Sequence, residues 1–430
     1  MLELNVIRAE REKVIRGLQK RNFREDQLSI VDEILERDEL RRKTQSELDG
    51  HLAAINAISK SIGALMQKGK KEEAAAAKQE VAVHKEAVKT LESRLESAKE
   101  ELDQLLIQLP NIPHKSVPAG KSADDNEVYR PWPQALPDLG PEALPHWELA
   151  KTYGLFDLEL GVKLTGAGFP VYRGKGARLE RALVNFFLDR ATAAGYEEIQ
   201  PPLMVNEDTA RATGQLPDKE AQMYYVERDN LYLIPTAEVP VTNIYRDVIL
   251  EEGDFPVKMT GYTPCFRREA GSYGAHVRGL NRVHQFDKVE IVQLQHPDRS
   301  YEALEEMMAH VAAVLGDLEL PYRILRLCGG DMGFTSALTF DFEVYSAAQQ
   351  RWLEVSSVSN FETFQSNRMK LRFRDSNKKM RLAHTLNGSA LALARIVAAL
   401  LENNQTAQGI VIPKALQPYT GFEIIPAIIP

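Results

Sequence analysis

The feature that most constrains the fold is a heptad repeat near the N-terminus. Seam positions alternate spacings of three and four without a break at Val81, His84, Val88, Leu91, Leu95, Ala98, Leu102, Leu105 and Leu109. Such spacing sustained over four heptads favours a coiled coil, in which a helix buries a narrow seam against another helix. The chain must therefore find a partner helix, either in itself or in a second copy.

The preceding segment offers such a partner. Residues 67–71 read Gln-Lys-Gly-Lys-Lys, a short turn with glycine at its centre. The flanking stretches, 26–66 and 71–109, are nearly equal in length, as the two legs of an antiparallel hairpin must be. At about 1.5 Å per residue, the expected arm is on the order of 60 Å long. The alternative is an intermolecular coiled coil that pairs two chains.

Composition limits the classes of protein to consider. At 430 residues the chain exceeds what one core usually supports. A net charge of −8 argues against a DNA partner or a general nucleic-acid coat, but local basic patches still allow a specific RNA. Only Cys265 and Cys328 are present, so no disulfide framework or Cys-x-x-Cys metal pattern is expected. The charged start and an apolar run at 390–401 interrupted by Arg395 predict no membrane partner and a cytoplasmic location.

A proline-rich segment marks a boundary. Eight prolines fall within residues 110–145, and repeated prolines block both helix continuation and strand pairing. We expect this segment to be a linker that drapes over its neighbours. It separates a helical arm at 1–109 from a mixed α/β domain at 146–430.

Residues 265–290 carry the most informative motif of that second domain. Arg267 and Glu269 are two apart, so on a strand they would share one face. Arginine forks match phosphate and carboxylate oxygens, and Phe286 offers a flat face to a base. Strand, glycine-rich loop and strand thus predict a nucleotide site, the alternative being an ordinary hairpin with solvated arginines. The glycines of the loop are Gly271, Gly274 and Gly279.

Three further clusters carry side chains that could bind a ligand or a metal ion. Residues 235–238, Pro-Thr-Ala-Glu, follow a strand-like stretch, and their hydroxyl and carboxylate suit an ammonium group. Residues 353–359 carry glutamate and serine oxygens, hard ligands that magnesium prefers. Residues 385–395 predict a small-residue turn that opens an apolar helix bearing Arg395, which is costly to bury unless an anion meets it. The alternative for Arg395 is a snorkelling surface side chain.

The order of these motifs carries a resemblance. Helix 179–194, followed by Gly-Tyr and a strand that leads to Pro-Pro, is similar to motif 1 of the class II aminoacyl-tRNA synthetases, and Arg-x-Glu with Arg-x-x-x-Phe at 282–286 resembles motif 2. With the N-terminal arm, Thr-Ala-Glu, Gly-Ser-Tyr-Gly, Glu-Val-Ser-Ser and Asn-Gly-Ser, essentially the whole chain resembles the bacterial-type seryl-tRNA synthetases. The arm discriminates this family from other class II enzymes.

The resemblance implies an α+β fold: an antiparallel sheet flanked by helices, preceded by an antiparallel α-helical coiled-coil arm that grips tRNA. It implies a homodimer that attaches serine to tRNA(Ser) through a seryl-adenylate, using ATP and Mg²⁺. Whether tRNA(Sec) is also charged stays open. Two rivals remain: an interaction protein with a catalytically dead scaffold, and a paralogue that loads a carrier protein, although known examples of that kind lack the arm.

The resemblance also assigns residues. The implied serine site comprises Thr236, Ala237, Glu238, Arg267, Glu290, Asn387 and Ser389. The implied ATP site comprises Arg267, Arg268, Glu269, Phe286, Glu354, Val355, Ser356, Ser357 and Arg395. Within it, Glu354 and Ser357 would hold Mg²⁺, and Arg267, Glu354 and Arg395 would be catalytic. The basic tip of the arm, Lys60, Lys68, Lys70 and Lys71, is expected to contact tRNA phosphates.

Overall fold

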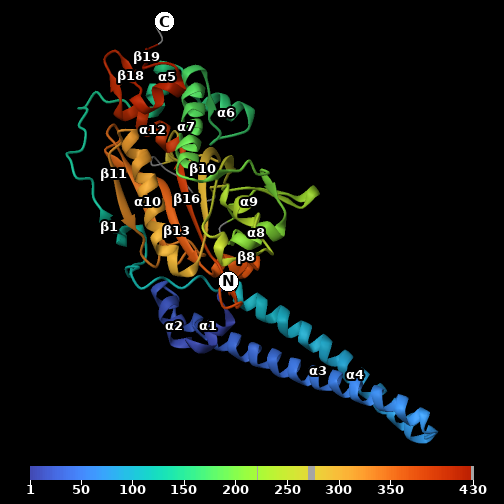
Figure 1. Cartoon of the computed structure of the whole chain (residues 1–430). Helices are drawn as coiled ribbons and strands as arrows, with labels where there is room; N and C mark the ends of the chain where they lie inside the picture. The colour runs from blue at the N-terminus through green and yellow to red at the C-terminus, as the bar shows by residue number, and fades with distance from the viewer. Residues whose placement is uncertain (220, 270–276, 428–430) are drawn as a thin grey trace. The chain divides into compact units, whose positions relative to one another are not determined.

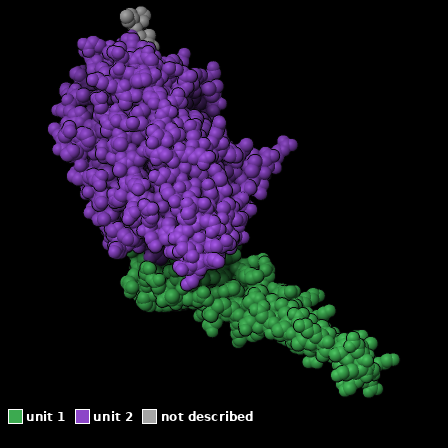
Figure 2. Space-filling model, viewed as in Figure 1, with its two compact units in different colours: residues 1–110 green, residues 111–430 purple. Residues whose placement is uncertain are grey.

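The computed structural model describes residues 1–219, 221–269 and 277–427. The chain divides into two compact units, Met1–Pro110 and Asn111–Pro430 (Figure 2). Within the described ranges, no helix is both long and apolar enough to span a membrane.

The first unit contains the helical hairpin that the heptads predict. Helices α3 (Ser29–Gln67) and α4 (Lys71–Leu106) lie side by side and run antiparallel (Figure 1). Gly69 in the turn between them has a φ of +75°, a left-handed conformation that glycine adopts without steric cost. The partner of the α4 seam is therefore α3 of the same chain, and the intermolecular alternative is wrong.

The interior of the hairpin follows the predicted seam. Leu48 of α3 packs in a buried cluster with Leu91 and Leu95 of α4. At the seam position of His84, the ring meets His51 with 2.8 Å between the two Nδ1 atoms. One of these nitrogens must donate a proton to the other, so this pair joins the helices through a polar contact.

A buried ion cluster explains the polar middle of α3. Asp38 is fully buried, and its carboxylate meets Arg41 at 2.8 Å and Arg42 at 3.2 Å on the next turn. Arg8 of α1 (Leu4–Ala9) approaches it at 3.3 Å. A buried charge is tolerated when it is paired, which is why a polar stretch interrupts the apolar pattern here. The unit also contains α2 (Arg11–Lys20) and η1 (Glu25–Gln27).

The second unit is built on a large sheet. Among the described residues, eight strands pair in the order β1-β11-β12-β13-β16-β10-β9-β4. Neighbouring strands are antiparallel, except that β4 runs parallel to β9. The strands are β1 (Glu127–Arg130), β4 (Glu197–Glu198), β9 (Val257–Phe266), β10 (Gln285–Gln295), β11 (Tyr322–Arg326), β12 (Leu338–Ser346), β13 (Arg351–Glu362) and β16 (His384–Ala392). The predicted antiparallel sheet is thus confirmed.

Helices flank this sheet. Helix α10 (Ser300–Asp317) packs on β13 and β16, whereas α7 (Gly174–Ala193) and α12 (Leu393–Asn403) pack on β10 (Figure 1). The predicted helix at 179–194 is therefore α7, which begins five residues earlier than expected. The remaining helices are α5 (His146–Tyr153), α6 (Leu158–Leu164), α8 (Glu207–Thr213), α9 (Glu238–Asn243), α11 (Phe364–Met369) and α13 (Gln417–Thr420).

Smaller strand groups complete the unit. They comprise β2 (Phe156–Asp157), β3 (Val171–Tyr172), β5 (Met204–Val205), β6 (Tyr225–Val226), β7 (Leu231–Leu233), β8 (Ile249–Glu251), β14 (Arg372–Arg374), β15 (Met380–Leu382), β17 (Gln405–Thr406), β18 (Gly409–Val411) and β19 (Ile424–Ile425). Strand β7 confirms the strand-like stretch expected before the Pro-Thr-Ala-Glu sequence.

The proline-rich segment contributes to the sheet, contrary to expectation. Strand β1 pairs antiparallel with β11 at one end of the strand order, with Glu127 opposite Arg326. The prediction that prolines exclude pairing is wrong here because residues 119–130 contain none. Pro131 stands directly after the strand, where no further ladder bond is needed.

The Asn-Gly-Ser sequence is also not a turn. Residues 387–389 lie inside β16, and the apolar helix begins only at Leu393. A Cβ added at Gly388 would lie 3.2 Å from a methyl group of Val358 on the adjacent strand. Small residues stand here because the strand packs closely on its surroundings, and such a run resembles a turn when only local sequence is considered.

Candidate active site

A cavity of about 540 Å³ opens over the centre of the sheet in the second unit. Its walls carry thirteen of the predicted residues: Thr236, Glu238, Arg267, Glu269, Phe286, Glu290, Glu354, Val355, Ser356, Ser357, Asn387, Ser389 and Arg395. Strand register explains why residues distant in sequence meet here. Glu290 of β10 lies opposite Ser389 of β16, and Asn387 lies opposite Ser359 of β13.

Two predicted residues are not on these walls. Ala237 is fully buried at the start of α9, where it packs in an apolar cluster. Arg268 is exposed, and its backbone N–H donates to the carbonyl oxygen of Gln222 at 2.9 Å. The two adjacent arginines therefore differ in position: Arg267 lines the cavity and Arg268 does not.

One end of the cavity contains a buried charge cluster. Glu290 is 1% exposed, and its Oε2 accepts from Lys288 Nζ at 2.7 Å and from Thr236 Oγ1 at 3.0 Å. Lys288 is a functional candidate that the sequence analysis missed. Its signal was present, because alternation along a strand places Phe286, Lys288 and Glu290 on one face.

Glu238 adds a second carboxylate to this end. Burial, followed by the nearby charge of Glu290, raises its pKa from 4.5 to about 7. Gln365 Nε2 donates to Glu238 Oε1 at 2.6 Å and partly offsets that rise. Glu238 and Glu290 thus present two carboxylates at this end, which suits a ligand that brings a cation.

Arg267 lies beside an aromatic wall of the cavity. Strand β9 ends at Phe266, but the N–H of Arg267 still donates to His284 O at 2.9 Å and so continues the pairing. Its guanidinium carbon lies 5.3 Å from the centre of the Phe286 ring, and its Nε donates to Pro235 O at 3.3 Å. Arg267 lines the cavity with a flat aromatic neighbour, and among the described residues only its Nε has a side-chain hydrogen bond, so its terminal NH₂ groups suit a phosphate.

Glu269 reaches the same cavity in a different way from that expected. It lies beyond the strand with a φ of +48°, and its carboxylate pairs with Arg282 Nε at 2.7 Å. Arg267 and Glu269 thus face one cavity although they do not share a strand face. The expected loop glycines Gly271 and Gly274, with the Gly-Ser-Tyr-Gly sequence, lie outside the described residues.

Arg395 also lines the cavity, from the first turn of α12. Its Nε donates to Asn281 O at 2.8 Å and its Nη1 to Glu354 O at 2.6 Å. The Glu354 carboxylate lies 3.8 Å from Nη1, and the Arg395 side chain is 27% exposed. Fixed by two carbonyl oxygens at a cavity wall, Arg395 is not the snorkelling residue of the alternative interpretation.

Oxygen donors gather beside Arg395. Asp341 of β12 lies opposite Ser357 of β13, and burial together with the charge of Glu354 raises the Asp341 pKa well above its usual range. Its Oδ1 is buried without a hydrogen-bond partner among the described residues. This orphaned oxygen, with Glu354 and Ser357, forms the hard donor set that suits Mg²⁺. Asp341 was also missed from sequence, since a lone aspartate in an apolar strand carries no motif.

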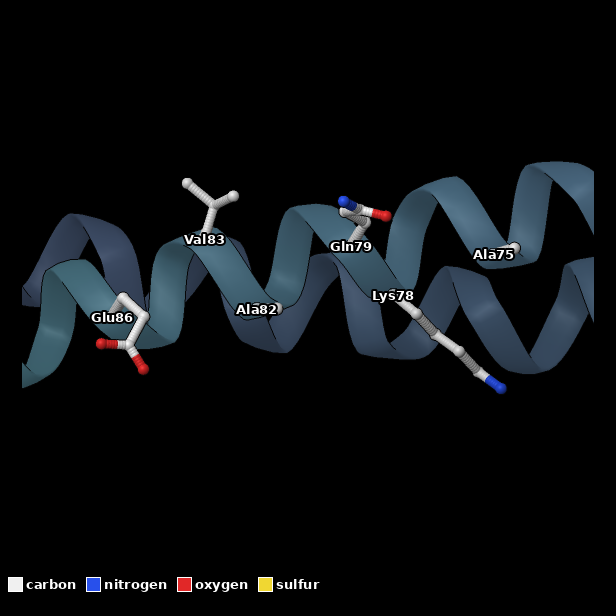
Figure 3. A pocket seen from close by; sticks show the side chains of 6 residues that line it. All are labelled: Ala75, Lys78, Gln79, Ala82, Val83 and Glu86. Carbon is white, nitrogen blue, oxygen red and sulfur yellow. The ribbon is translucent and has the colours of Figure 1, made fainter.

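A second hollow lies on the arm. Figure 3 shows this shallow groove along the outer side of α4, lined by Ala75, Lys78, Gln79, Ala82, Val83 and Glu86. The tip lysines lie in and near the α3–α4 turn and are exposed: Lys60, Lys68, Lys70 and Lys71. Lys70 pairs with Glu73 at 2.8 Å, which leaves most of the tip charge facing solvent.

Comparison with known proteins agrees in both units. Residues 1–113 match the family model "Seryl-tRNA synthetase N-terminal domain", and residues 224–404 match "tRNA synthetase class II core domain (G, H, P, S and T)". The serine–tRNA ligase of Salinibacter ruber is 52% identical over 429 residues, which cover 99% of this chain and 100% of that protein.

Solved structures give the same result. The crystal structure of seryl-tRNA synthetase from Pyrococcus horikoshii complexed with ATP is 34% identical with a TM-score of 0.91, covering 100% of both chains. The cytoplasmic serine–tRNA ligase from Naegleria fowleri in complex with AMP is 25% identical with a TM-score of 0.87, covering 100% of this chain and 99% of that one. With full-length identity, both domain matches and the fold in agreement, the chain belongs to the seryl-tRNA synthetase family of class II aminoacyl-tRNA synthetases.

Proposed function

We propose that the cavity joins serine to ATP as seryl-adenylate and that the protein then transfers the seryl group to tRNA(Ser). The observation that carries this proposal is the set of groups on the walls of one cavity. The buried carboxylates of Glu238 and Glu290, Arg267 beside the Phe286 ring, and Arg395 beside Glu354 all line it. An amino acid and a nucleoside triphosphate need these groups together.

Each of these groups matches a part of the substrates. Glu238 takes the α-ammonium of serine, and Glu290 with Ser389 takes its hydroxyl. Arg267 bridges the serine carboxylate and the α-phosphate, while Phe286 stacks on adenine. Arg395 contacts the γ-phosphate. These roles follow from the family resemblance and are supported by the placement of all six side chains on the walls of one cavity.

The chemistry requires positioning more than proton transfer. The serine carboxylate is already ionised at pH 7 and attacks the α-phosphorus, so that pyrophosphate leaves with its electron pair. In the second step a terminal ribose hydroxyl of tRNA attacks the activated carbonyl and AMP leaves. Arginine side chains fixed by carbonyl oxygens stabilise the charge that develops at phosphate, without reorganising during the reaction.

Glu354 and Ser357, with Asp341, would hold Mg²⁺ at the phosphate end. When bound, the ion neutralises phosphate charge and orients the triphosphate. The orphaned Asp341 oxygen and the half-exposed Glu354 carboxylate support this assignment.

The partners follow from the two units. We propose that the arm binds tRNA(Ser), supported by its exposed lysines and its long helical hairpin. A homodimer stays a prediction, which the exposed apolar side chains of Leu203 and Met204 after β4 support. Charging of tRNA(Sec) stays open, and a cytoplasmic location stays a prediction from sequence.

Serine-dependent exchange of labelled pyrophosphate into ATP tests the proposed activity. The purified protein should exchange with serine and much less with glycine, alanine or threonine. A catalytically dead scaffold would show no exchange with any amino acid. A carrier-protein ligase would exchange but would leave tRNA uncharged.

Serine binding should depend on pH through Glu238. Its pKa is raised to about 7, so below that value a proton must leave before the carboxylate can pair with the serine ammonium. The KM for serine in pyrophosphate exchange should therefore rise roughly tenfold per pH unit below pH 7 and level off above it. In Glu238→Gln the KM should be high at every pH. A Glu238→Gln profile that still falls with rising pH would assign the titration to another group.

Discrimination against alanine should depend on the hydroxyl end. In Glu290→Gln or Ser389→Ala, the ratio of kcat/KM for serine to that for alanine should fall roughly 10- to 100-fold, because polar groups left unpaired by alanine would be lost. Ser359→Ala is the matched control. Its hydroxyl also lines the cavity but already bonds Thr339 Oγ1 at 2.9 Å. Unchanged discrimination in both test variants would place hydroxyl recognition elsewhere.

A further inference from the structure

Helix α5 contacts the stretch that leads into β10 through three consecutive side chains. His146 is fully buried, and its Nε2 accepts the backbone N–H of Leu280 at 2.8 Å. The Trp147 ring lies 4.8 Å from the guanidinium carbon of Arg278. Glu148 Oε1 pairs with that same guanidinium at 3.3 Å. None of these three α5 residues lines the cavity, yet Leu280 does.

The imidazole of His146 is fixed from its other side by Glu402 of α12. Glu402 is fully buried, and its Oε1 lies 2.6 Å from His146 Nδ1 and accepts the His146 backbone N–H at 2.8 Å. Gln349 Nε2 donates to Oε1 at 2.9 Å, and Ser346 Oγ donates to Oε2. Because Nε2 is an acceptor, the ring proton must sit on Nδ1 and point to Glu402, so one neutral tautomer is selected.

The same contacts belong to a closed hydrogen-bond network that includes Arg395, a proposed catalytic residue. Asn281 Nδ2 donates to Gln349 Oε1 at 2.9 Å, and Gln349 also bonds Glu402. The Asn281 carbonyl accepts from Arg395 Nε at 2.8 Å. Arg395 and Glu402 are two turns apart on α12, so they project from the same side of the helix.

We propose that the His146–Glu402 pair is a positioning element for the phosphate end of the active site. The pair holds the backbone N–H of Leu280. The next residue, Asn281, thereby presents its carbonyl oxygen to Arg395, and Arg282 is thereby positioned on the cavity wall. The serine end is built on β10, β16 and α9, and among the described residues it makes no hydrogen bond or ion pair with His146 or Glu402. Loss of the pair should therefore affect ATP far more than serine. This inference rests on the proposed function, because it assigns the network to ATP recognition.

The His146 ring lies so close to the backbone at position 279 that only glycine fits there. Gly279 has a φ of +70°, and an added Cβ would lie 2.2 Å from His146 Nε2. Alanine at this position would displace the ring from Leu280 while leaving both His146 and Glu402 in place. Gly279→Ala thus disturbs the proposed contact without deleting either partner.

The test measures pyrophosphate exchange in full-length variants, with KM and kcat determined separately for ATP and serine. His146→Ala should raise the KM for ATP roughly tenfold and lower kcat by a similar factor, since small misplacements of reacting groups are costly. The KM for serine should stay within about twofold. His146→Gln should recover most of the loss, because its amide oxygen can accept from Leu280 while its NH₂ group donates to Glu402.

Gly279→Ala provides a second route should His146→Ala not fold, and it should show the same ATP-specific loss. His310→Gln is the matched control. His310 is another largely buried histidine, packed on Tyr196 of the described core and absent from the cavity walls. Its kinetics should equal those of the unmodified protein.

The outcomes separate cleanly. ATP-specific loss with rescue by glutamine supports the proposal. Unchanged ATP kinetics in folded His146→Ala or Gly279→Ala overturns it, as does an equal loss for serine and ATP or an absence of rescue. Lack of serine-dependent exchange in the unmodified protein would instead overturn the proposed function itself.

Discussion

Replacing Arg267 with alanine is expected to lower the rate of adenylate formation by at least about a hundredfold while the protein stays folded. This arginine lies on the cavity wall with its guanidinium carbon 5.3 Å from the centre of the Phe286 ring, where the proposed function puts the α-phosphate between serine and adenine. The transition state concentrates negative charge at the α-phosphate. Without the Arg267 guanidinium, that charge loses a pair of fixed hydrogen-bond donors. The measurement is serine-dependent pyrophosphate exchange, with thermal unfolding to confirm the fold.

The adjacent Arg268 provides a matched control. It has the same side chain one position along, but it is exposed and does not line the cavity. Arg268→Ala should therefore lose far less exchange activity than Arg267→Ala. Near-normal exchange in Arg267→Ala, or equal losses in the two variants, would contradict the role given to Arg267.

Shortening the arm is expected to separate the two steps of the reaction. The hairpin can be cut where its seam remains intact, by removing residues 49–90 and joining Leu48 to Leu91 through a short glycine-containing turn. These two leucines already pack together, so the base of the hairpin keeps its buried contacts. Pyrophosphate exchange should stay within about twofold, whereas kcat/KM for tRNA should fall at least about a hundredfold, because phosphate contacts dominate nucleic-acid affinity.

A milder variant removes the positive charge of the arm tip and keeps the full length of the arm. Replacing Lys60, Lys68, Lys70 and Lys71 with glutamine should weaken tRNA charging and reduce its dependence on salt, while serine activation is unchanged. If the shortened arm abolished exchange and charging equally in a folded protein, the hairpin would have a role in catalysis itself. If charging survived the cut, tRNA would be held by other surfaces.

Local periodicity determined which parts of the fold could be predicted. The heptads predicted α4 and the need for a partner helix, because buried seam residues such as Leu91 and Leu95 recur at a local spacing. The burial of Asp38 could not be predicted in that way, since one of its three arginine partners, Arg8, lies on a separate helix. Strand β1 was missed for a similar reason. Its partner β11 lies about two hundred residues away, and no local pattern encodes a pairing at that distance.

The site shows the same division. Motif residues such as Arg267, Glu290 and Arg395 were found because short spacings carry their chemistry. Lys288 was recoverable from strand alternation, although its charge is explained only by the buried carboxylate beside it. The small residues around Gly388 resemble a turn in the local sequence because the close packing that demands them comes from a neighbouring strand. The spacing of residues within a motif therefore predicts the candidate site residues, whereas the residues that pack on them or pair with them depend on the tertiary structure.

The most direct test of the central claim is the charging of total tRNA with labelled serine, glycine, alanine and threonine in parallel. If Glu238 accepts the serine ammonium and Glu290 with Ser389 accepts the hydroxyl, as proposed, the cavity should select serine, and the arm should restrict charging to the tRNA that it binds. We predict ATP-dependent incorporation of serine into acid-precipitable tRNA, hybridising to serine-accepting species, with little incorporation of the other three. Incorporation of another amino acid in preference to serine, or serine activation without any charging of tRNA, would contradict the assignment.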